Sequence, residues 1–394
     1  MAEAGYGRQS FKWPTRGFAL AAALLLSACS TIVPKTTAPI TAPPPTVTVP
    51  TKPIQGALPE DQARHRVALL VPLTGPNAAV GQSIANAAAL ALADTGGKDL
   101  RITNYDTAPG ASAAAAKALA DGNGLLLGPL LAEDVRAVSA AAAAARVPVI
   151  AFSNDATVTA DNVWLLGFSP VQSIDRVVRY ARSKGLTRFA GLMPQGAYGR
   201  NASGILIRSV EAAGGTVVAM QNYDRSAASL QAAITKLAKV KYDAVLIADS
   251  GRIAVRTAPL INKAAGGPVR LLGTELWNAE PGLSAAPAMA GAWFASVDDE
   301  TFGQLATRYR ARYGRSPYRL ASLGYDAVLL TARVAKDWKR NDPFPIDKLT
   351  DQGGFAGVDG AFRFSEGHVA ERALAVHQIG PGGGTTVSPA PKGF

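Results

Sequence analysis

Thiols and imidazoles are scarce in this chain, whose 394 residues include one cysteine and three histidines. A single cysteine, Cys29, excludes a disulfide within the chain and supplies too few thiolates for a cysteine-ligated metal. The histidines, His65, His368 and His377, lie in separate segments and do not indicate a metal site. Because 48% of residues are hydrophobic and 18% are charged, we expect a body held by a hydrophobic core, with no metal and no cofactor.

The absence of a long basic run and of known catalytic motifs argues against two classes of function. The formal net charge is +11, yet the lysines and arginines are scattered without a long basic run, which argues against nucleic acid as a partner. The chain contains no G-x-S-x-G elbow, no S-x-x-K motif and no G-x-x-x-x-G-K phosphate loop, and it shows no carboxylate pair at a fixed spacing. We therefore expect no catalytic residue and no enzymatic activity.

The N-terminal segment is typical of a bacterial export signal. Three basic residues precede an apolar run at residues 18–26, which is shorter than the roughly 20 residues of a membrane-spanning helix. The following letters "LSAC" resemble the lipobox of bacterial lipoproteins, so residues 1–28 are interpreted as a lipoprotein signal peptide. The resemblance implies that Cys29 is the lipidation site and carries palmitate-type acyl chains, which anchor the protein to a membrane.

Segments poor in regular structure flank the central part of the chain. Residues 29–62 are rich in proline and threonine, which favours an extended tether of about 3.1 Å per residue over helices or paired strands. Residues 380–394, "GPGGGTTVSPAPKGF", are predicted to form a disordered tail. The part between them is long enough for two domains.

The central part alternates apolar strands with helices. The letters "RVALLVPLTG" form a continuous apolar run, and "NAAVGQSIANAAALALADTG" repeats apolar residues at helical spacing. The alternation continues through "LRITNYDT", "GLLLGP" and "PVIAFSND", and a second series begins at "RFAGLMP". Strands that are buried on both faces and separated by helices predict parallel sheets, and the two series predict an α/β protein with two lobes.

The carboxyl ends of these strands are the expected place for a ligand, because helix N-termini offer free amide groups there. We therefore take the side chains at those ends as candidate cleft residues. In the first series they are Thr74, Leu130, Leu131, Ser153, Asn154 and Asp155, and in the second they are Tyr198, Asp249, Ser250, Glu275 and Trp277.

Several segments carry a resemblance to a known family. The stretches "VALLVPLTGPNAAVGQSIANAAALAL", "LLGPLLAEDV", "VPVIAFSND" and "GYDAVLLTARVA" resemble, in this order, the type I fold of leucine/isoleucine/valine-type periplasmic binding proteins. The likeness runs from about residue 67 to residue 379. Within that superfamily, "LLGTELW" and "GGFAGVDGAFRFSEGHVAERALAVHQI" are most similar to the LppC-type lipoproteins identified as penicillin-binding protein activators.

The resemblance also implies how the chain is divided. It predicts two lobes joined by three crossovers, each lobe a parallel sheet flanked by helices. Lobe one is expected at residues 64–168 plus 296–350, and lobe two at residues 169–295 plus 351–379.

In amino-acid binders of this fold, hydroxyl groups of the first lobe hold the ligand carboxylate and an acidic residue of the second lobe pairs with its ammonium. The resemblance places Ser153 and Glu275 in those roles and Tyr198 over the ligand. Two features depart from it. Leu130 and Leu131 stand where such binders commonly have hydroxyls, and Asp155 would add negative charge beside a ligand carboxylate.

Two functions stay open at this point. As a non-enzymatic activator lipoprotein, the chain would contact a class A penicillin-binding protein, a peptidoglycan synthase, from a membrane anchor in the periplasm. The hydroxyl-poor turn favours this function, and Ser30 after the lipidated cysteine favours the outer membrane over the inner one. The alternative is a substrate-binding lipoprotein of a branched-chain amino-acid ABC transporter, with a small ligand such as an amino acid in its cleft.

Overall fold

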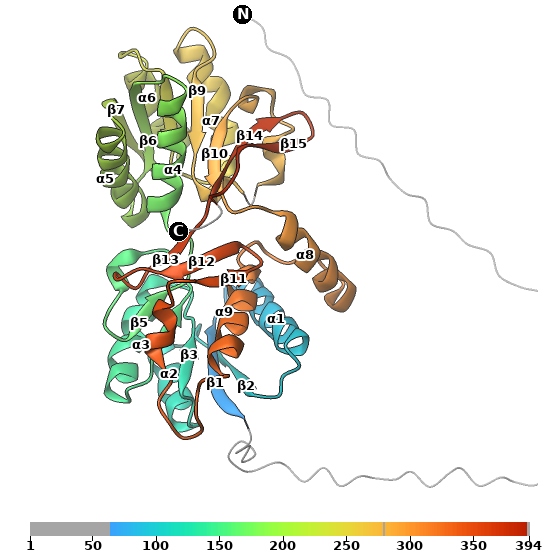
Figure 1. Ribbon diagram of the computed structural model, residues 1–394. Coiled ribbons are helices and arrows are strands. Elements are labelled where there is room, and N and C mark those ends of the chain that lie inside the picture. Colours follow the sequence, from blue (N-terminus) through green and yellow to red (C-terminus); the bar gives the residue numbers. More distant parts are fainter. Residues whose placement is uncertain (1–63, 279, 392–394) are drawn as a thin grey trace, which may run out of the picture. The chain divides into compact units, whose positions relative to one another are not determined.

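The first lobe is built on a five-stranded parallel sheet. The computed structural model describes residues 64–278 and 280–391. The strands of this sheet follow the order β2-β1-β3-β4-β5. Residues 67–71 of the inner strand β1 are fully buried, because helices cover both faces of the sheet (Figure 1). The strands are β1 (His65–Val71), β2 (Leu100–Asp106), β3 (Leu125–Leu127), β4 (Val149–Ala151) and β5 (Val163–Leu165).

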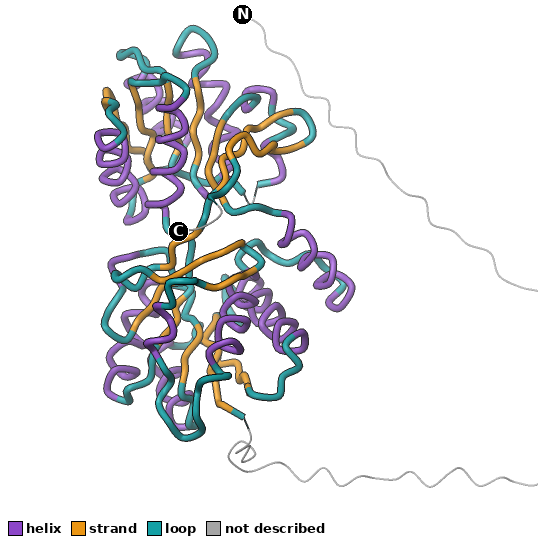
Figure 2. The backbone as a smooth tube through the Cα atoms, viewed as in Figure 1, coloured by secondary structure: helices purple, strands orange, loops and turns teal. Residues whose placement is uncertain are grey.

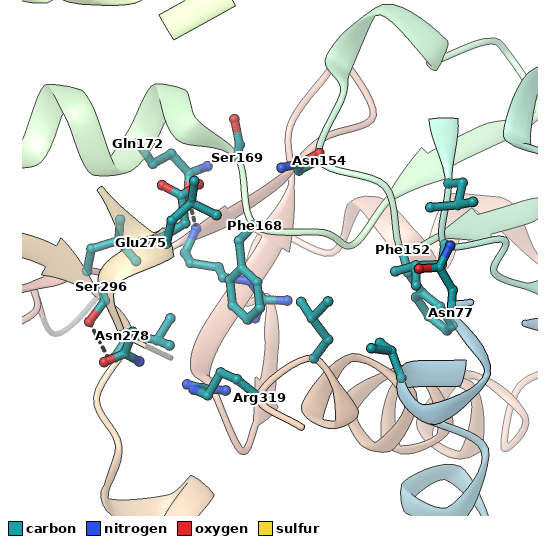
Figure 3. Close-up of a pocket in the computed structure, with 18 residues that line it drawn as sticks. Asn77, Phe152, Asn154, Phe168, Ser169, Gln172, Glu275, Asn278, Ser296 and Arg319 are labelled. Atoms are coloured by element: carbon teal, nitrogen blue, oxygen red, sulfur yellow. Dashed lines mark hydrogen bonds between the residues drawn. The ribbon is translucent and has the colours of Figure 1, made fainter. Parts of the chain in front are cut away.

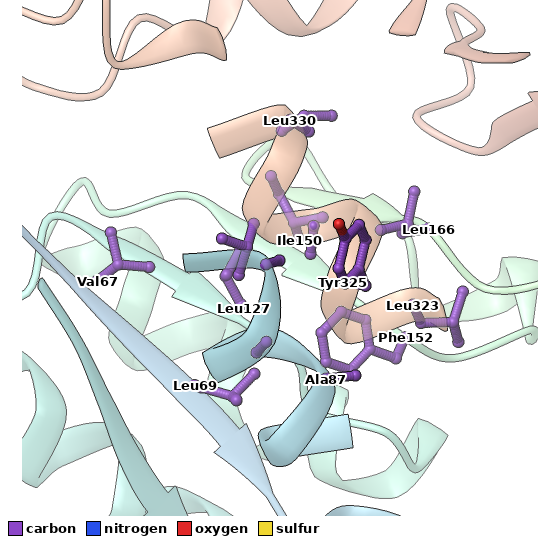
Figure 4. Packing of buried hydrophobic residues seen from close by; sticks show 14 of the residues in the cluster. Val67, Leu69, Ala87, Leu127, Ile150, Phe152, Leu166, Leu323, Tyr325 and Leu330 are labelled. Atoms are coloured by element: carbon purple, nitrogen blue, oxygen red, sulfur yellow. The ribbon is translucent and has the colours of Figure 1, made fainter. Parts of the chain in front are cut away.

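Two helices lie on each face of this sheet. Alanine-rich α2 and α3 pack on one face, where their small side chains allow close approach. Helices α1 and α9 pack on the other face, joined by Leu305 and Tyr309 of α8, and Figure 4 shows Ala87 of α1 and Leu323 of α9 in this cluster. The helices are α1 (Ala78–Asp94), α2 (Ala111–Ala120), α3 (Ala132–Ala144), α8 (Glu300–Tyr313) and α9 (Ala321–Val334).

The second lobe repeats the design with a seven-stranded sheet in the order β15-β14-β10-β9-β8-β6-β7. Strands β6 to β10 run parallel, whereas β14 and β15 are antiparallel to their neighbours. Helices α4 and α5 cover one face, and α6 and α7 cover the other. The elements are α4 (Pro170–Ser183), β6 (Arg188–Pro194), α5 (Ala197–Ala212), β7 (Thr216–Tyr223), α6 (Ala227–Leu237), β8 (Ala244–Ile247), α7 (Gly251–Ala264), β9 (Arg270–Gly273), β10 (Trp293–Ser296), β14 (Ala375–Gly380) and β15 (Gly383–Ser388).

A small antiparallel sheet of β11 (Phe355–Gly357), β12 (Gly360–Phe364) and β13 (Ala370–Arg372) lies on the first lobe. Its phenylalanines are buried in the same cluster as α9, and the Val358 amide donates to Asp326 Oδ1 of α9 at 2.7 Å. The prediction that residues 351–379 belong wholly to lobe two is therefore wrong for this sheet. Burial of its aromatic side chains against α9 decides where it packs.

The predicted disordered tail is also wrong over most of its described length. Residues Gly383–Ser388 form β15, which pairs with β14 through a turn at Gly382 and Gly383, both with positive φ. Arg176 of α4 holds the end of this hairpin, because its Nη2 atom donates to Ser388 Oγ at 2.6 Å. The glycines that indicated disorder serve as the hairpin turn instead.

The chain passes between the lobes three times, as Figure 2 lets the reader follow. The passages lie between β5 and α4, between β10 and α8, and between β13 and β14, since the residues on either side belong to different cores. In the described part of the chain, no helix has the length and apolar character needed to cross a membrane. The predicted signal peptide, Cys29 and the tether lie outside the described residues.

Candidate ligand-binding cavity

A cavity of about 450 Å³ is lined by residues of both lobes, within the range of small-molecule sites. Figure 3 shows the labelled side chains around it. The first lobe contributes Asn77, Val80, Leu130, Leu131, Phe152, Asn154, Phe168, Arg319, Leu320 and Arg372. Segments of the second lobe and its connections contribute Ser169, Gln172, Glu275, Leu276, Asn278, Ser296, Val297 and Leu374.

Most of these side chains follow the carboxyl end of a parallel strand. Asn77 is the N-cap residue of α1, Leu131 is that of α3, and Asn154 follows β4. In the second lobe Glu275 follows β9 and Ser296 ends β10. This is the edge at which open α/β sheets bind ligands.

Glu275 is held in place by two hydroxyl groups. The Ser173 hydroxyl donates to Oε2 of Glu275, and the Tyr198 hydroxyl lies 3.2 Å from Oε1. Burial raises the pKa of the Glu275 carboxyl above its usual range, against the opposing effect of these hydrogen bonds. The carboxyl group is thus part of the cavity wall and already has partners of its own.

The structure places the first-lobe candidates in two groups. Leu130, Leu131 and Asn154 line the cavity. Ser153 is buried and its Oγ accepts the Asp155 amide at 3.2 Å, so the hydroxyl is used within its own turn.

The remaining candidates of this lobe also have local partners. Asp155 accepts a hydrogen bond from Arg136 Nη2 at 3.2 Å, and its Oδ1 accepts one from the Thr157 amide at 3.0 Å. The Thr74 hydroxyl donates to Asp106 at 2.6 Å. Asp155 and Thr74 do not line the cavity.

Among the second-lobe candidates only Glu275 lines the cavity, and Tyr198 stands behind it. Asp249 is buried and accepts the Tyr223 hydroxyl at 2.6 Å, while Ser250 is the N-cap residue of α7. Trp277 is fully buried in the core and borders a separate cavity of about 270 Å³. These candidates were chosen because they follow strand ends, but side chains such as Asp249 and Trp277 are buried within the lobe and do not face this cavity.

Sequence reasoning missed two buried arginines in the cavity wall. Arg319 Nη1 donates to Asp359 Oδ1 at 2.6 Å. Arg372 Nη2 donates to the Leu166 carbonyl at 2.9 Å, and its Nη1 lies 3.9 Å from Asp326 Oδ2. No local pattern marks these arginines, because their burial depends on the small sheet packing on the first lobe.

Asp326 is the second buried carboxyl group of this cluster. Burial, and next the nearby charge of Asp359, raise the pKa of Asp326 to about 7. The native state therefore keeps a proton at pH values where the unfolded chain has released it. We expect this group to make the free energy of unfolding decrease as the pH rises from about 4 to 7, by at most about 1.4 kcal/mol per pH unit.

Replacing Asp326→Asn is expected to remove that contribution while keeping the acceptor for the Val358 amide. Urea denaturation at several pH values between 4 and 7 measures the slope, and the difference between variant and wild type isolates the contribution of Asp326. Asp161→Asn at an exposed position is the control for removing a carboxylate. Equal slopes in wild type and Asp326→Asn would contradict the prediction.

Comparison with known proteins identifies the family of this chain. Residues 65–384 match the family described as Periplasmic binding protein. The chain belongs to the periplasmic binding protein family. This supports the periplasm as its compartment and confirms the predicted two-lobed α/β fold with parallel sheets flanked by helices.

Solved structures of other binding proteins share the fold. The leucine-binding protein LivK of Thermotoga maritima has a TM-score of 0.66 and 18% identity, with 83% of this chain and 99% of that chain covered. A solute-binding protein of an ABC transporter from R. palustris, solved with benzoate, has a TM-score of 0.63 and 21% identity, covering 83% and 97%.

A curated relative is an uncharacterized protein, RP748, of Rickettsia prowazekii, 26% identical over 149 residues. The match covers 37% of this chain and 40% of the Rickettsia protein. Among the described residues of this periplasmic binding protein, no group of three or more His, Cys, Asp or Glu side chains is arranged to hold a metal ion.

Proposed function

We propose that this periplasmic binding protein holds a small organic ligand in its cavity, without catalysis, as the substrate-binding component of an ABC transporter. The observation that carries the proposal is the cavity of about 450 Å³ lined by both lobes. Its wall combines nine apolar side chains with nine polar or charged ones, and small-molecule sites likewise pair apolar surface with polar groups that orient the ligand. The related binding proteins described as binding leucine or solved with benzoate support the same class of function.

The proposal includes a lipid anchor at Cys29 and a spacer at residues 29–62. The "LSAC" motif supports the anchor, and the proline content supports the spacer. With these elements the binding domain stays close to a membrane and meets its ligand in the periplasm.

A second candidate function is activation of a class A penicillin-binding protein, with the lipoprotein anchored in the outer membrane. One observation favours it over an amino-acid receptor. The first-lobe rim presents Leu130 and Leu131, and the Ser153 hydroxyl is used within its own turn, so no hydroxyl cradle for an amino-acid carboxylate is present in these turns. In this candidate the body is a docking module and needs no ligand.

Filling the cavity tests the first function. Leu131 lines the cavity, so Leu131→Trp is expected to abolish the binding of any small ligand that stabilises the wild type. The measurement is isothermal titration calorimetry with leucine, isoleucine and benzoate, together with the melting temperature in the presence of each compound. Ile346→Trp is the control, because Ile346 is 47% exposed in a 3-10 turn and does not line the cavity.

The outcome separates the two candidates. Binding that is lost in Leu131→Trp and kept in Ile346→Trp supports a receptor. If no compound binds, and Leu131→Trp stimulates glycan polymerisation by a purified class A penicillin-binding protein as well as the wild type does, the activator function replaces it.

A further inference from the structure

Two guanidinium groups stand in the wall of the cavity, and both are buried. The side chain of Arg319 is 10% exposed and that of Arg372 is 2% exposed. Arg319 precedes α9 and Arg372 ends β13, so both come from late segments that pack on the first lobe. Figure 3 shows Arg319 and Phe168 facing the same space.

The hydrogen bonds of these arginines are incomplete. Arg319 uses Nη1 for Asp359 and for the Ser322 hydroxyl. Its Nε lies 3.4 Å from Asp299 Oδ1, but Nε and Nη2 have no hydrogen-bond partner. In Arg372, Nε and Nη1 are also without one. A buried charged donor without an acceptor raises the free energy of the protein, so an anion that accepts hydrogen bonds from these nitrogens would be bound favourably.

The charges around the cavity favour an anion over a cation. Asp359 offsets Arg319 through a direct hydrogen bond and the exposed Asp299 lies 3.4 Å from its Nε, whereas the Asp326 carboxyl group lies 3.9 Å from Arg372 Nη1. Burial raises the pKa of both Asp326 and Glu275, which lowers the negative charge that they place near the cavity. Burial lowers the pKa of the Arg372 guanidinium, but guanidinium groups start from so high a pKa that they stay protonated in proteins near neutral pH.

Half of the lining side chains are apolar and some of these are aromatic, while seven polar side chains besides the two arginines line the cavity as well. The Phe168 ring lies 5.7 Å from the Arg319 guanidinium carbon and 4.9 Å from that of Arg372. Phe152, Leu130 and Leu320 continue the apolar surface. A ligand that contacts both the arginines and this apolar surface has an anionic group at one end and an apolar body.

We propose that Arg319 and Arg372 form an anion subsite that binds the carboxylate of a monocarboxylic acid whose apolar body packs against Phe168 and the neighbouring apolar side chains of the cavity. The proposal rests on the function proposed above and names its substrate class. Nε and Nη2 of Arg319 both lack a hydrogen-bond partner, and this pair of neighbouring N–H groups matches the two oxygens of one carboxylate. An α-ammonium group would meet this positive wall, so leucine is expected to bind more weakly than the same skeleton without its amino group.

Matched pairs of compounds test the subsite by calorimetry on the full chain. The probes are benzoate with benzamide, and 4-methylpentanoate with 4-methylpentanamide and leucine. We expect at least one carboxylate to bind at least about tenfold more tightly than its amide, and 4-methylpentanoate to bind more tightly than leucine. Arg319→Lys keeps a cation beside Asp359 but loses the planar fork, and should weaken carboxylate binding about tenfold while leaving amide binding unchanged.

Arg333→Lys is the control, because Arg333 is 53% exposed and pairs with Asp351 away from the cavity. The subsite is overturned if an amide or leucine binds as tightly as the matching carboxylate and its affinity is unchanged in Arg319→Lys. The receptor function still stands in that case, provided that the compound no longer binds to Leu131→Trp. If no probe binds the wild type, the receptor function fails and the subsite fails with it. Melting temperatures of each variant show that the fold is retained.

Discussion

Replacing Gly199→Ala is expected to destabilise the protein by about 3 kcal/mol or more. Gly199 lies in the first turn of α5, and a methyl group at this position would overlap the carbonyl oxygen of Pro194 at the end of β6. The overlap is with backbone, so the helix has to move away from the strand it follows. Overpacking that shifts backbone in a core typically costs 1–3 kcal/mol and occasionally more.

The first lobe repeats this contact, since a methyl group at Gly81 of α1 would overlap the carbonyl oxygen of Pro72 after β1. We expect Gly81→Ala to have an effect similar to that of Gly199→Ala. The matched control is Gly204→Ala in the same helix as Gly199, where the nearest atom is Arg208 Nη1 at 3.2 Å, the end of a flexible side chain.

Gly204→Ala should be neutral or stabilise the protein by about 0.5–1 kcal/mol, because alanine is a better helix former than glycine. Urea denaturation gives the three free energies of unfolding. Equal stabilities of Gly199→Ala and Gly204→Ala would show that α5 does not need this close approach.

Replacing Asp359→Ala is expected to cost about 3–5 kcal/mol, because it leaves the Arg319 guanidinium buried without its main acceptor. Asp359 is fully buried and accepts Arg319 Nη1 at 2.6 Å. The control is an exposed ion pair, since the side chains of Arg333 and Asp351 are 53% and 42% exposed. Asp351→Ala removes the carboxylate of this pair and should cost no more than about 1 kcal/mol.

A double variant separates the buried charge from the lost packing. Arg319→Met combined with Asp359→Ala removes both charges and should recover most of the lost stability, since an apolar pair needs no partner in the core. Thermal and urea unfolding of the single and double variants measure the coupling. If the double variant is as unstable as Asp359→Ala, lost packing and not the unpaired charge causes the effect.

The sequence predicted those features that depend on local periodicity. The apolar run from Val67 to Val71 is buried on both faces, as a continuous run without alternation indicates. The rule that ligands bind at strand ends identified Glu275 and Leu131 as cavity residues. These features follow from the order of residues within one strand and the turn after it.

Features that depend on distant segments could not be predicted in this way. No local pattern marks Arg372, which is buried because β13 packs on the first lobe. Ser153 and Asp155 have the right chemistry for a ligand, but each finds a partner within its own turn or on α3. The glycines after residue 380 indicated disorder by composition, whereas their freedom at positive φ makes a hairpin turn.

The threefold passage of the chain between the lobes has a consequence for the order of folding. The core of the first lobe needs α9 and the small sheet, and the sheet of the second lobe needs β14 beside β10. A nascent chain that ends before residue 355 therefore completes neither lobe, although it already contains all five strands of the first sheet. Contacts between residues so far apart in sequence raise the contact order and slow folding. Neither lobe reaches its full stability until the last strands have been synthesised.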